Sequence, residues 1–437
     1  MKKIEQALKL ARETRALQMG INILDGFPAL FTEQFPSKKA IIIADSTTFE
    51  VAGRAISEYL RGAGITQEEP VVFTVPDLHA DYVHIEQLES KLAPTDAIPV
   101  AVGAGTINDL TKLAAHNTGR PYICVATAAS MDGYTAYGAS ITYRGNKQTF
   151  TCPAPQAVLA DIEIIRNAPT ELTASGYADL FAKIPAGADW ILSDELGVEA
   201  IEPVSWSIIQ DDLLYALSNP AGARAGAVEA IIPLVEGLML SGFAMQWTRT
   251  SRVASGAEHH FSHLWDMEHH THNGKAPSHG FKVGIATLYI SALYEKLLLH
   301  PFDQLDVAAC CAQWPEWEQL EAQKRMMFAE VDFLDTVLTE SRAKYITKSE
   351  LAKQLETLKT RWPSMKERLA RQLLPAADVK RRLQLVGAPV EPEEIGISRT
   401  RLRNSFRRAQ CLRNRFTILD MAVRTSCLDH FLDQLFG

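Results

Sequence analysis

The chain has 437 residues, 47% of them hydrophobic and 22% charged, with a formal net charge of −8. This length exceeds that of one compact core and predicts two domains, while the acidic balance argues against nucleic acid as a partner. No apolar run reaches the roughly 20 residues of a membrane span. The six cysteines are scattered without C-x-x-C spacing, which is typical of a reduced, cytoplasmic protein.

Residues 1–20, MKKIEQALKLARETRALQMG, are expected to form an amphipathic helix. They lack the uninterrupted apolar core and the small-residue cleavage site of a signal peptide.

Apolar runs then alternate with helical patterns. The runs at 38–46, 70–76, 97–106 and 121–130 predict buried strands, and the segments between them, 49–64, 80–93 and 107–119, predict helices. Strict alternation of strand and helix favours a parallel sheet with helical crossovers. Two short polar–apolar runs around RGNK, within residues 139–153, predict a β-hairpin.

From Pro169 onward nearly the whole sequence has helical periodicity, and the tail from Lys344 is helical as well. The predicted fold is therefore an α/β nucleotide-binding domain over residues 1–167 followed by an all-α domain over residues 168–437.

A glycine loop, VGAGTIND at 102–109, follows the third predicted strand and opens a helix. Gly103 and Gly105 would let backbone amides approach a phosphate at the positive end of the helix dipole. A simple tight turn between strand and helix is the alternative. The loop belongs to the third strand–helix unit rather than the first, which indicates a nucleotide-binding family other than the standard Rossmann type.

Residues 257–280 hold seven of the 12 histidines of the chain, which favours metal binding or acid–base chemistry. His259 and His263 are four residues apart and share one helix face, whereas His260 points about 100° away. Asp179, in GYADLFAK, either forms an ion pair with Lys183 or joins two histidines as the third ligand of a catalytic metal.

His279 stands at the start of the next predicted helix. His269, His270 and His272 fall in a predicted loop between the two helices, where we expect them to be exposed.

Five segments share their order and spacing with a known family: GAGTINDLTK, TAASMDGYTAYGA, GYADLFAKIPAGADW, SGAEHHFSH and HGFKVG. Together they resemble the sn-glycerol-1-phosphate dehydrogenases, which belong to the superfamily of iron-containing alcohol dehydrogenases and dehydroquinate synthases. The similarity covers about residues 20–300. It implies a dehydroquinate synthase-like fold, in agreement with the two domains predicted above.

The resemblance also implies residue roles. The metal ligands would be Asp179, His259 and His279, and Asp132 and His263 would contact the substrate. The cofactor, NAD(H) or NADP(H), would be held by Asp45, Gly103, Ala104, Gly105, Thr106, Ile107, Thr127, Ala128, Ala129 and Ser130. An acid at Asp45 favours NAD, because it would repel the 2′-phosphate of NADP; capping of the next segment is the alternative role of Asp45.

The sequence departs from the family at Ala136, where serine is usual, at Val253, where proline is usual, and at Phe281. None of these positions is a ligand, but they bear on cofactor preference and on substrate detail. Arg252, Lys147 and Arg144 are the candidates for binding a substrate phosphate.

The activity that the resemblance implies is the reversible, metal-dependent reduction of dihydroxyacetone phosphate, a phosphorylated triose, to sn-glycerol 1-phosphate. Zn²⁺ is the expected ion, with Ni²⁺ or Fe²⁺ as alternatives, and the protein is expected to be a homo-oligomer, a dimer or larger. A polyol or glycerol dehydrogenase is one alternative. A dehydroquinate synthase-like lyase is another, although glutamate is usual there in place of Asp179. An intact ligand set argues against a non-catalytic binding protein.

The segment 399–416, RTRLRNSFRRAQCLRNRF, is strongly basic. Its apolar residues recur at helical spacing, so we expect a helix packed on the body of the protein with arginines paired to acidic neighbours, not a nucleic-acid site.

Overall fold

The computed structural model describes residues 2–144 and 146–437, which form two compact units. The first comprises the chain up to Leu180 together with Ser207–Ser251 and Leu385–Gly387, and the second comprises Phe181–Trp206, Arg252–Gln384 and Ala388–Gly437. The domain boundary after residue 167 stays a prediction.

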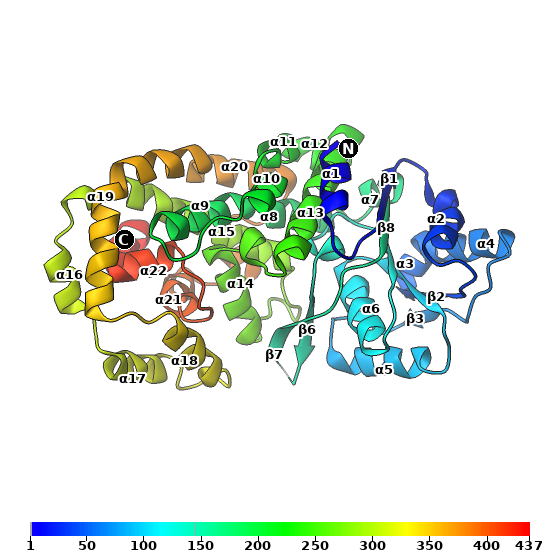
Figure 1. The fold of residues 1–437 in the computed structure, drawn as a ribbon, viewed down its shortest axis with the longest axis horizontal. Coiled ribbons are helices and arrows are strands. Elements are labelled where there is room, and N and C mark those ends of the chain that lie inside the picture. Colours follow the sequence, from blue (N-terminus) through cyan, green and yellow to red (C-terminus); the bar gives the residue numbers. More distant parts are fainter. Residues whose placement is uncertain (1, 145) are drawn as a thin grey trace. The chain divides into compact units, whose positions relative to one another are not determined.

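The first unit is built on a six-stranded parallel sheet in the order β1-β8-β5-β4-β2-β3. Figure 1 shows its two outer pairs, β1 with β8 and β2 with β3. Its strands are β1 (Ala16–Gly20), β2 (Ala40–Asp45), β3 (Val71–Phe73), β4 (Ile98–Gly103), β5 (Ile123–Ala126) and β8 (Ala157–Asp161). The predicted α/β fold and its strands β2 to β5 are confirmed. The central strands are continuous apolar runs because both faces of the sheet are covered by helices.

The prediction of one helix over residues 1–20 is wrong in its second half. The helix α1 ends at Leu10, and Ala16–Gly20 forms β1, which pairs with β8 at the edge of the sheet. All five residues of β1 are half-buried, so the strand shows neither a buried apolar run nor a clear alternation.

The helices of the first unit connect and cover the strands. They are α1 (Lys2–Leu10), α2 (Phe27–Gln34), α3 (Ser46–Thr48), α4 (Arg54–Gly62), α5 (Tyr82–Leu92), α6 (Gly105–Asn117), α7 (Ile162–Arg166), α8 (Thr170–Phe181), α11 (Leu213–Ala216), α12 (Pro220–Arg224) and α13 (Val228–Thr248). The last residue of α8 already belongs to the second unit. The predicted hairpin is also present, as the antiparallel pair β6 (Ala139–Tyr143) and β7 (Asn146–Phe150).

The second unit is helical throughout, as predicted for the C-terminal part. Its helices are α9 (Lys183–Glu195), α14 (Ala257–Met267), α15 (His279–Leu299), α16 (Val307–Gln313), α17 (Trp317–Met327), α18 (Leu334–Ala343), α19 (Lys348–Gln372), α21 (Arg399–Ala409), α22 (Ile418–Arg424) and α23 (Leu428–Phe436). The short α10 (Pro203–Gln210) and α20 (Ala376–Val386) each carry residues of both units. The core packs residues such as Phe261, Trp265, Trp362 and Phe406.

One helix, α13, is long and apolar enough to cross a membrane by length and composition, with a mean hydropathy of 1.6. The sequence pattern had not predicted such a run. In the structure 72% of its most apolar window is buried within the protein, as in the core helix of a globular fold. Its Gln246 amide donates to Thr14 Oγ1 at 2.7 Å and to the Thr135 carbonyl at 2.6 Å, tying three distant segments of the first unit together.

The helix α8 passes very close to the segment after β5. A Cβ atom at Gly176 would lie 2.0 Å from the Ala129 carbonyl oxygen, far inside any real contact distance. At Gly62, the last residue of α4, an added Cβ atom would meet nothing within 4 Å, so this glycine offers a matched control.

We expect Gly176→Ala to lower the free energy of unfolding by about 3 kcal/mol or more, because two main-chain segments would have to separate. Gly62→Ala should raise it by about 0.5–1 kcal/mol, since alanine restricts the unfolded chain. Thermal and urea unfolding of both variants measure this. An unchanged melting temperature for Gly176→Ala would contradict the close approach of α8.

Candidate active site

A cavity of about 1200 Å³ opens at the carboxyl ends of the parallel strands of the first unit. This edge of an open parallel sheet is where α/β proteins bind their ligands. Six of the predicted cofactor residues line the cavity: Asp45, Ala104, Thr106, Ile107, Thr127 and Ala128. The other four, Gly103, Gly105, Ala129 and Ser130, are not among the lining residues.

The glycine loop joins β4 to the 13-residue helix α6, whose first turn begins at Gly105. A Cβ atom at Gly103 would lie 2.6 Å from Ile107 Cβ, and one at Gly105 would lie 3.1 Å from Met131. The loop therefore needs both glycines to remain this tight. Its unpaired amides start a full-length helix next to the cavity, an arrangement that suits a phosphate.

Asp45 ends β2 and caps α3. Its Oδ1 accepts from Thr48 N at 2.8 Å, and its own N–H donates to Thr48 Oγ1 at 3.1 Å. The capping role is thus confirmed, and since Asp45 also lines the cavity, the role toward a ribose stays a prediction.

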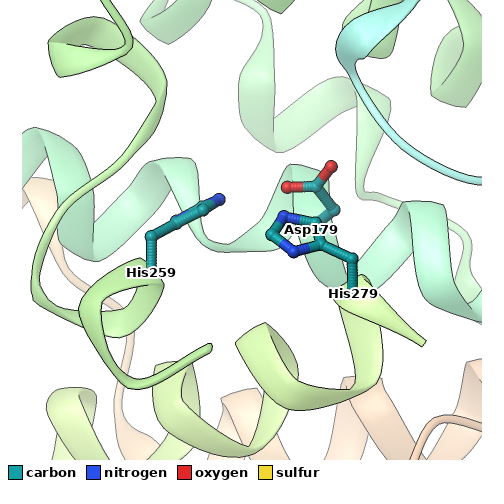
Figure 2. Close-up of side chains that lie close together, drawn as sticks. All are labelled: Asp179, His259 and His279. Carbon is teal, nitrogen blue, oxygen red and sulfur yellow. The ribbon is translucent and has the colours of Figure 1, made fainter. Parts of the chain in front are cut away.

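Figure 2 shows Asp179, His259 and His279 pointing toward one another from α8, α14 and α15. Their ligand atoms all lie within 4.8 Å of one another. Asp179 is fully buried and His259 is 6% exposed, while His279 is half-buried. The two imidazole centroids are 5.3 Å apart. One carboxylate and two imidazoles in this arrangement can hold a divalent cation.

Neighbouring side chains orient both imidazoles. His259 Nδ1 lies 2.8 Å from Glu258 Oε1, and the same oxygen accepts from Gly256 N at 2.6 Å. A carboxylate only accepts, so Nδ1 of His259 carries the hydrogen and Nε2 keeps its lone pair for a cation. His279 Nδ1 lies 3.3 Å from Ser262 Oγ. The role of Glu258, next to the proposed ligand His259 in sequence, was not predicted.

Asp132 is held close to the proposed ligand Asp179. Its main-chain N–H donates to Asp179 Oδ2 at 3.1 Å, and its own Oδ2 accepts from Ser241 Oγ at 2.7 Å. Both carboxylates therefore have fixed orientations, which a side chain that positions a small substrate needs.

Lys112 holds the segment on which Asp132 stands. Its fully buried ammonium group donates to the carbonyl oxygens of Gly133, Ala136 and Gly138, each at 3.0 Å. Only the main chain of Ala136 takes part, so the departure from serine there leaves this clamp intact. Lys112 belongs to the GAGTINDLTK segment, but nothing in the sequence indicated this contact.

His263 is half-buried on α14, one turn beyond His259. Burial, followed by the positive charge of Arg413, lowers the pKa of His263 well below its usual range. The ring is therefore neutral near pH 7, able to accept a hydrogen bond at one nitrogen and donate one at the other.

Of the three histidines expected in an exposed loop, His269 alone is exposed. His272 is half-buried and His270 is 8% exposed, so the prediction of an exposed loop is wrong for His270. Arg401 Nη1 lies 2.8 Å from its Nδ1, and the Ile395 carbonyl lies 2.7 Å from its Nε2. Arginine only donates, so Nε2 carries the hydrogen, and burial lowers the pKa of His270.

The predicted phosphate-binding residues have other surroundings. Arg252 is 2% exposed, its Nε lies 3.1 Å from Glu199 Oε2, and its Nη2 donates to the Asp189 carbonyl at 3.1 Å. Arg144 is exposed and its guanidinium lies over the Tyr143 ring. Lys147 is half-buried on β7. Arg252 thus has a structural role in the second unit.

Comparisons with known proteins agree with this picture. The model of the iron-containing alcohol dehydrogenase family matches residues 18–169. The glycerol-1-phosphate dehydrogenase (NAD(P)+) of Geobacillus thermodenitrificans is 32% identical over 392 residues, 87% of this chain and 86% of that protein. Its counterpart from Halalkalibacterium halodurans is 36% identical over 285 residues, 65% of this chain and 71% of that protein.

Among solved structures, glycerol dehydrogenase from Schizosaccharomyces pombe superposes with a TM-score of 0.60 at 16% identity. The alignment covers 97% of this chain and 91% of that one. At this identity the likeness establishes the fold alone.

We expect His259→Ala and His279→Ala to lose bound metal with the fold intact, since each removes one of three proposed ligands. Glu258→Ala should weaken metal affinity about 10- to 100-fold through the lost orientation of His259. The exposed His269→Ala serves as the control. Metal content after dialysis and competition with a chelator measure these effects, and metal retained by His259→Ala but lost by His269→Ala would refute the ligand set.

Proposed function

Because the chain belongs to the glycerol-1-phosphate dehydrogenase family and is an NAD(P)-dependent oxidoreductase, we propose that it reduces dihydroxyacetone phosphate to sn-glycerol 1-phosphate, reversibly. The observation that carries the proposal is the cluster of Asp179, His259 and His279, whose ligand atoms lie within 4.8 Å of one another in a chain of this family. A homo-oligomeric assembly and a cytoplasmic location are further parts of the proposal.

The donor set fits a divalent metal ion. Two imidazole nitrogens and one carboxylate oxygen suit Zn²⁺ first, with Ni²⁺ and Fe²⁺ as alternatives, and three protein ligands leave room for substrate. Held by Asp179, His259 and His279, such an ion would polarise the substrate carbonyl and stabilise the negative charge that develops on its oxygen. The hydrogen bond from His259 Nδ1 to Glu258 supports this assignment.

The first unit would hold the cofactor. The amides at the start of α6 would bind the pyrophosphate, and Thr127 and Ala128 would line the cavity next to the nicotinamide half. Asp45, across the same cavity, would accept hydrogen bonds from the adenosine ribose while it caps α3.

Asp132 and His263 would contact the substrate. The Asp132 carboxylate is fixed by Ser241 Oγ at 2.7 Å and can accept from a substrate hydroxyl. The neutral His263 ring can take up a proton at one nitrogen and release one from the other, which suits a relay toward the carbonyl oxygen as it becomes an alcohol.

With NADH, the protein should reduce dihydroxyacetone phosphate with a kcat/KM about two to four decades above that for dihydroxyacetone. Two charge-assisted hydrogen bonds to the phosphate, at roughly 1.5–3 kcal/mol each, account for that range. Cofactor absorbance gives the rates, and a stereospecific glycerol-3-phosphate dehydrogenase gives the control for product configuration. Equal rates on both ketones, or consumption of the product by the coupling enzyme, would refute the proposal.

NADH should serve at least as well as NADPH, because the Asp45 carboxylate would repel a 2′-phosphate. Asp45→Ser should shift the ratio of the kcat/KM values toward NADPH, because serine keeps a capping oxygen for α3 and removes the charge. Thermal unfolding of the same variant checks that the cap survives. A wild-type protein that strongly prefers NADPH would rule out this role of Asp45.

A further inference from the structure

The basic segment 399–416 contains seven arginines, and five of them follow the predicted pattern of pairing with acids. All five stand on α21: Arg399 pairs with Glu391, Arg401 and Arg408 with Glu268, Arg403 with Asp433 and Arg407 with Asp429. The other two, Arg413 and Arg415, lie in the loop 410–417 that follows the helix, and their surroundings differ.

The loop 410–417 is held in place by hydrogen bonds to neighbouring segments. Arg415 Nη1 donates to the Ser255 carbonyl at 2.5 Å, and Asn414 N donates to Glu340 Oε2 at 2.7 Å. At its end, Ile418 N donates to Asp189 Oδ1 at 2.8 Å. The backbone on either side of Arg413 is therefore fixed, and its side chain is presented from an ordered loop.

Arg413 is a half-buried cation whose guanidinium hydrogen bond is a long one, 3.4 Å to the carbonyl of its neighbour Leu412. Across residues 2–144 and 146–437, no carboxylate lies within ion-pair distance of it. Burial lowers the pKa of Arg413, and Glu340 is the acid that acts against this. A guanidinium kept in this setting has donors to offer to an anion.

His260 provides a second, independent observation. It is 1% exposed, and neither of its ring nitrogens has a hydrogen-bond partner in the described part of the chain. Buried polar groups are nearly always paired, so an imidazole in this state indicates a missing partner. The side chains whose positive charge most strongly opposes protonation of His260 are Arg415, Lys344 and Arg413.

Of these cations, Lys344 is matched by Asp420, at 2.7 Å. Of the acids that act on Arg415, Glu199 lies 3.1 Å from Arg252, and Glu258 accepts from His259 and Gly256. The acids that act on the two arginines, Glu258 and Glu340, already accept from main-chain N–H groups. A phosphomonoester, with strong acceptor oxygens, would offer acceptors to the Arg413 guanidinium and to the ring N–H of His260.

The position of His260 on α14 links it and Arg413 to the proposed reaction. His260 and His263 are three residues apart on α14 and so share a side of the helix. Among the charged side chains, Arg413 contributes most to lowering the pKa of His263, which follows His259 by one turn of α14. Because Arg415, two residues after Arg413, donates to the Ser255 carbonyl just before α14, a substrate held beside His259 and His263 would extend toward this loop.

We propose that Arg413 and His260 form an anion subsite, with Arg415 adding charge, that binds the phosphoryl group of a phosphorylated ketone substrate. The inference rests on the proposed function, and it places the source of phosphate specificity in the C-terminal part of the chain, outside the five segments quoted in the sequence analysis. Arg413 supplies planar paired donors, and His260 supplies one N–H from a ring fixed by burial.

The test compares Arg413→Gln with Arg407→Gln, a matched loss of an arginine whose pair with Asp429 lies at the surface. Arg413→Gln should lower the ratio of kcat/KM for dihydroxyacetone phosphate over dihydroxyacetone by about ten- to hundred-fold, the loss of one charge-assisted contact. Arg413→Lys should fall between wild type and Arg413→Gln, and Arg407→Gln should keep the wild-type ratio. An unchanged ratio in Arg413→Gln would overturn the proposal.

Titration calorimetry with inorganic phosphate on the metal-free protein gives a readout without turnover. Wild type and Arg407→Gln should bind phosphate, and Arg413→Gln and His260→Phe should bind it at least about tenfold more weakly. Equal binding by wild type and Arg413→Gln would overturn the subsite. If the wild-type protein binds phosphate but reduces neither ketone, and Arg413→Gln does not bind phosphate, the subsite is upheld and the proposed function is refuted.

Inorganic phosphate should also compete with dihydroxyacetone phosphate and not with NADH in the steady state. Competition with NADH alone would overturn the proposal, because it would assign the anion site to the cofactor. Inhibition that competes with neither ligand would overturn it as well, because the cluster would then be a separate effector site.

Discussion

The buried ammonium group of Lys112 is the interaction on which the geometry of the first unit depends. A cation inside a protein is costly unless each of its donors is satisfied, and Lys112 meets this condition with three carbonyl oxygens at 3.0 Å. Because Lys112 stands on α6, the helix that opens at the glycine loop, its hydrogen bonds tie this loop to the segment with Asp132. Asp132 in turn donates its N–H to Asp179, so one helix borders the cavity and also helps to orient a proposed ligand.

The second unit has its own buried polar centre in Asp189. Its carboxylate accepts from Tyr294 Oη at 2.6 Å, Ala257 N at 2.7 Å and Ile418 N at 2.8 Å, which joins α9, α15, α14 and α22. Burial, and then the nearby charge of Glu258, raises the pKa of Asp189 to about 7. This centre fixes the start of α14, on which His259 stands, and the end of the loop that carries Arg413. The proposed metal ligand His259 and the proposed anion subsite thus share one anchor.

The sequence predicted most reliably what repeats or matches a pattern. The apolar runs gave β2 to β5, and five segments in family order led to Asp179, His259 and His279, which the structure does bring together. The predictions from sequence were wrong where contacts between distant segments of the chain determine the structure. The strand β1 was mistaken for helix because a short, half-buried edge strand has no distinctive pattern. His270 was expected in solvent because its partners, Arg401 and Ile395, lie more than a hundred residues away in sequence. No spacing rule connects Lys112 to its three carbonyls, or separates Arg413 from the five paired arginines before it.

The first unit is interrupted in sequence, and this affects how the protein is made. When synthesis has reached Phe181, all six strands of the sheet exist, but α13 has not yet left the ribosome. Residues 181–206, which belong to the second unit, are synthesised next. Gln246, which donates to Thr14 and Thr135, is synthesised only after them. The long apolar helix α13 is therefore synthesised after the part of the first unit against which it packs. This interval, in which α13 is unpacked, is the stage of biogenesis at which chaperones have a surface to recognise.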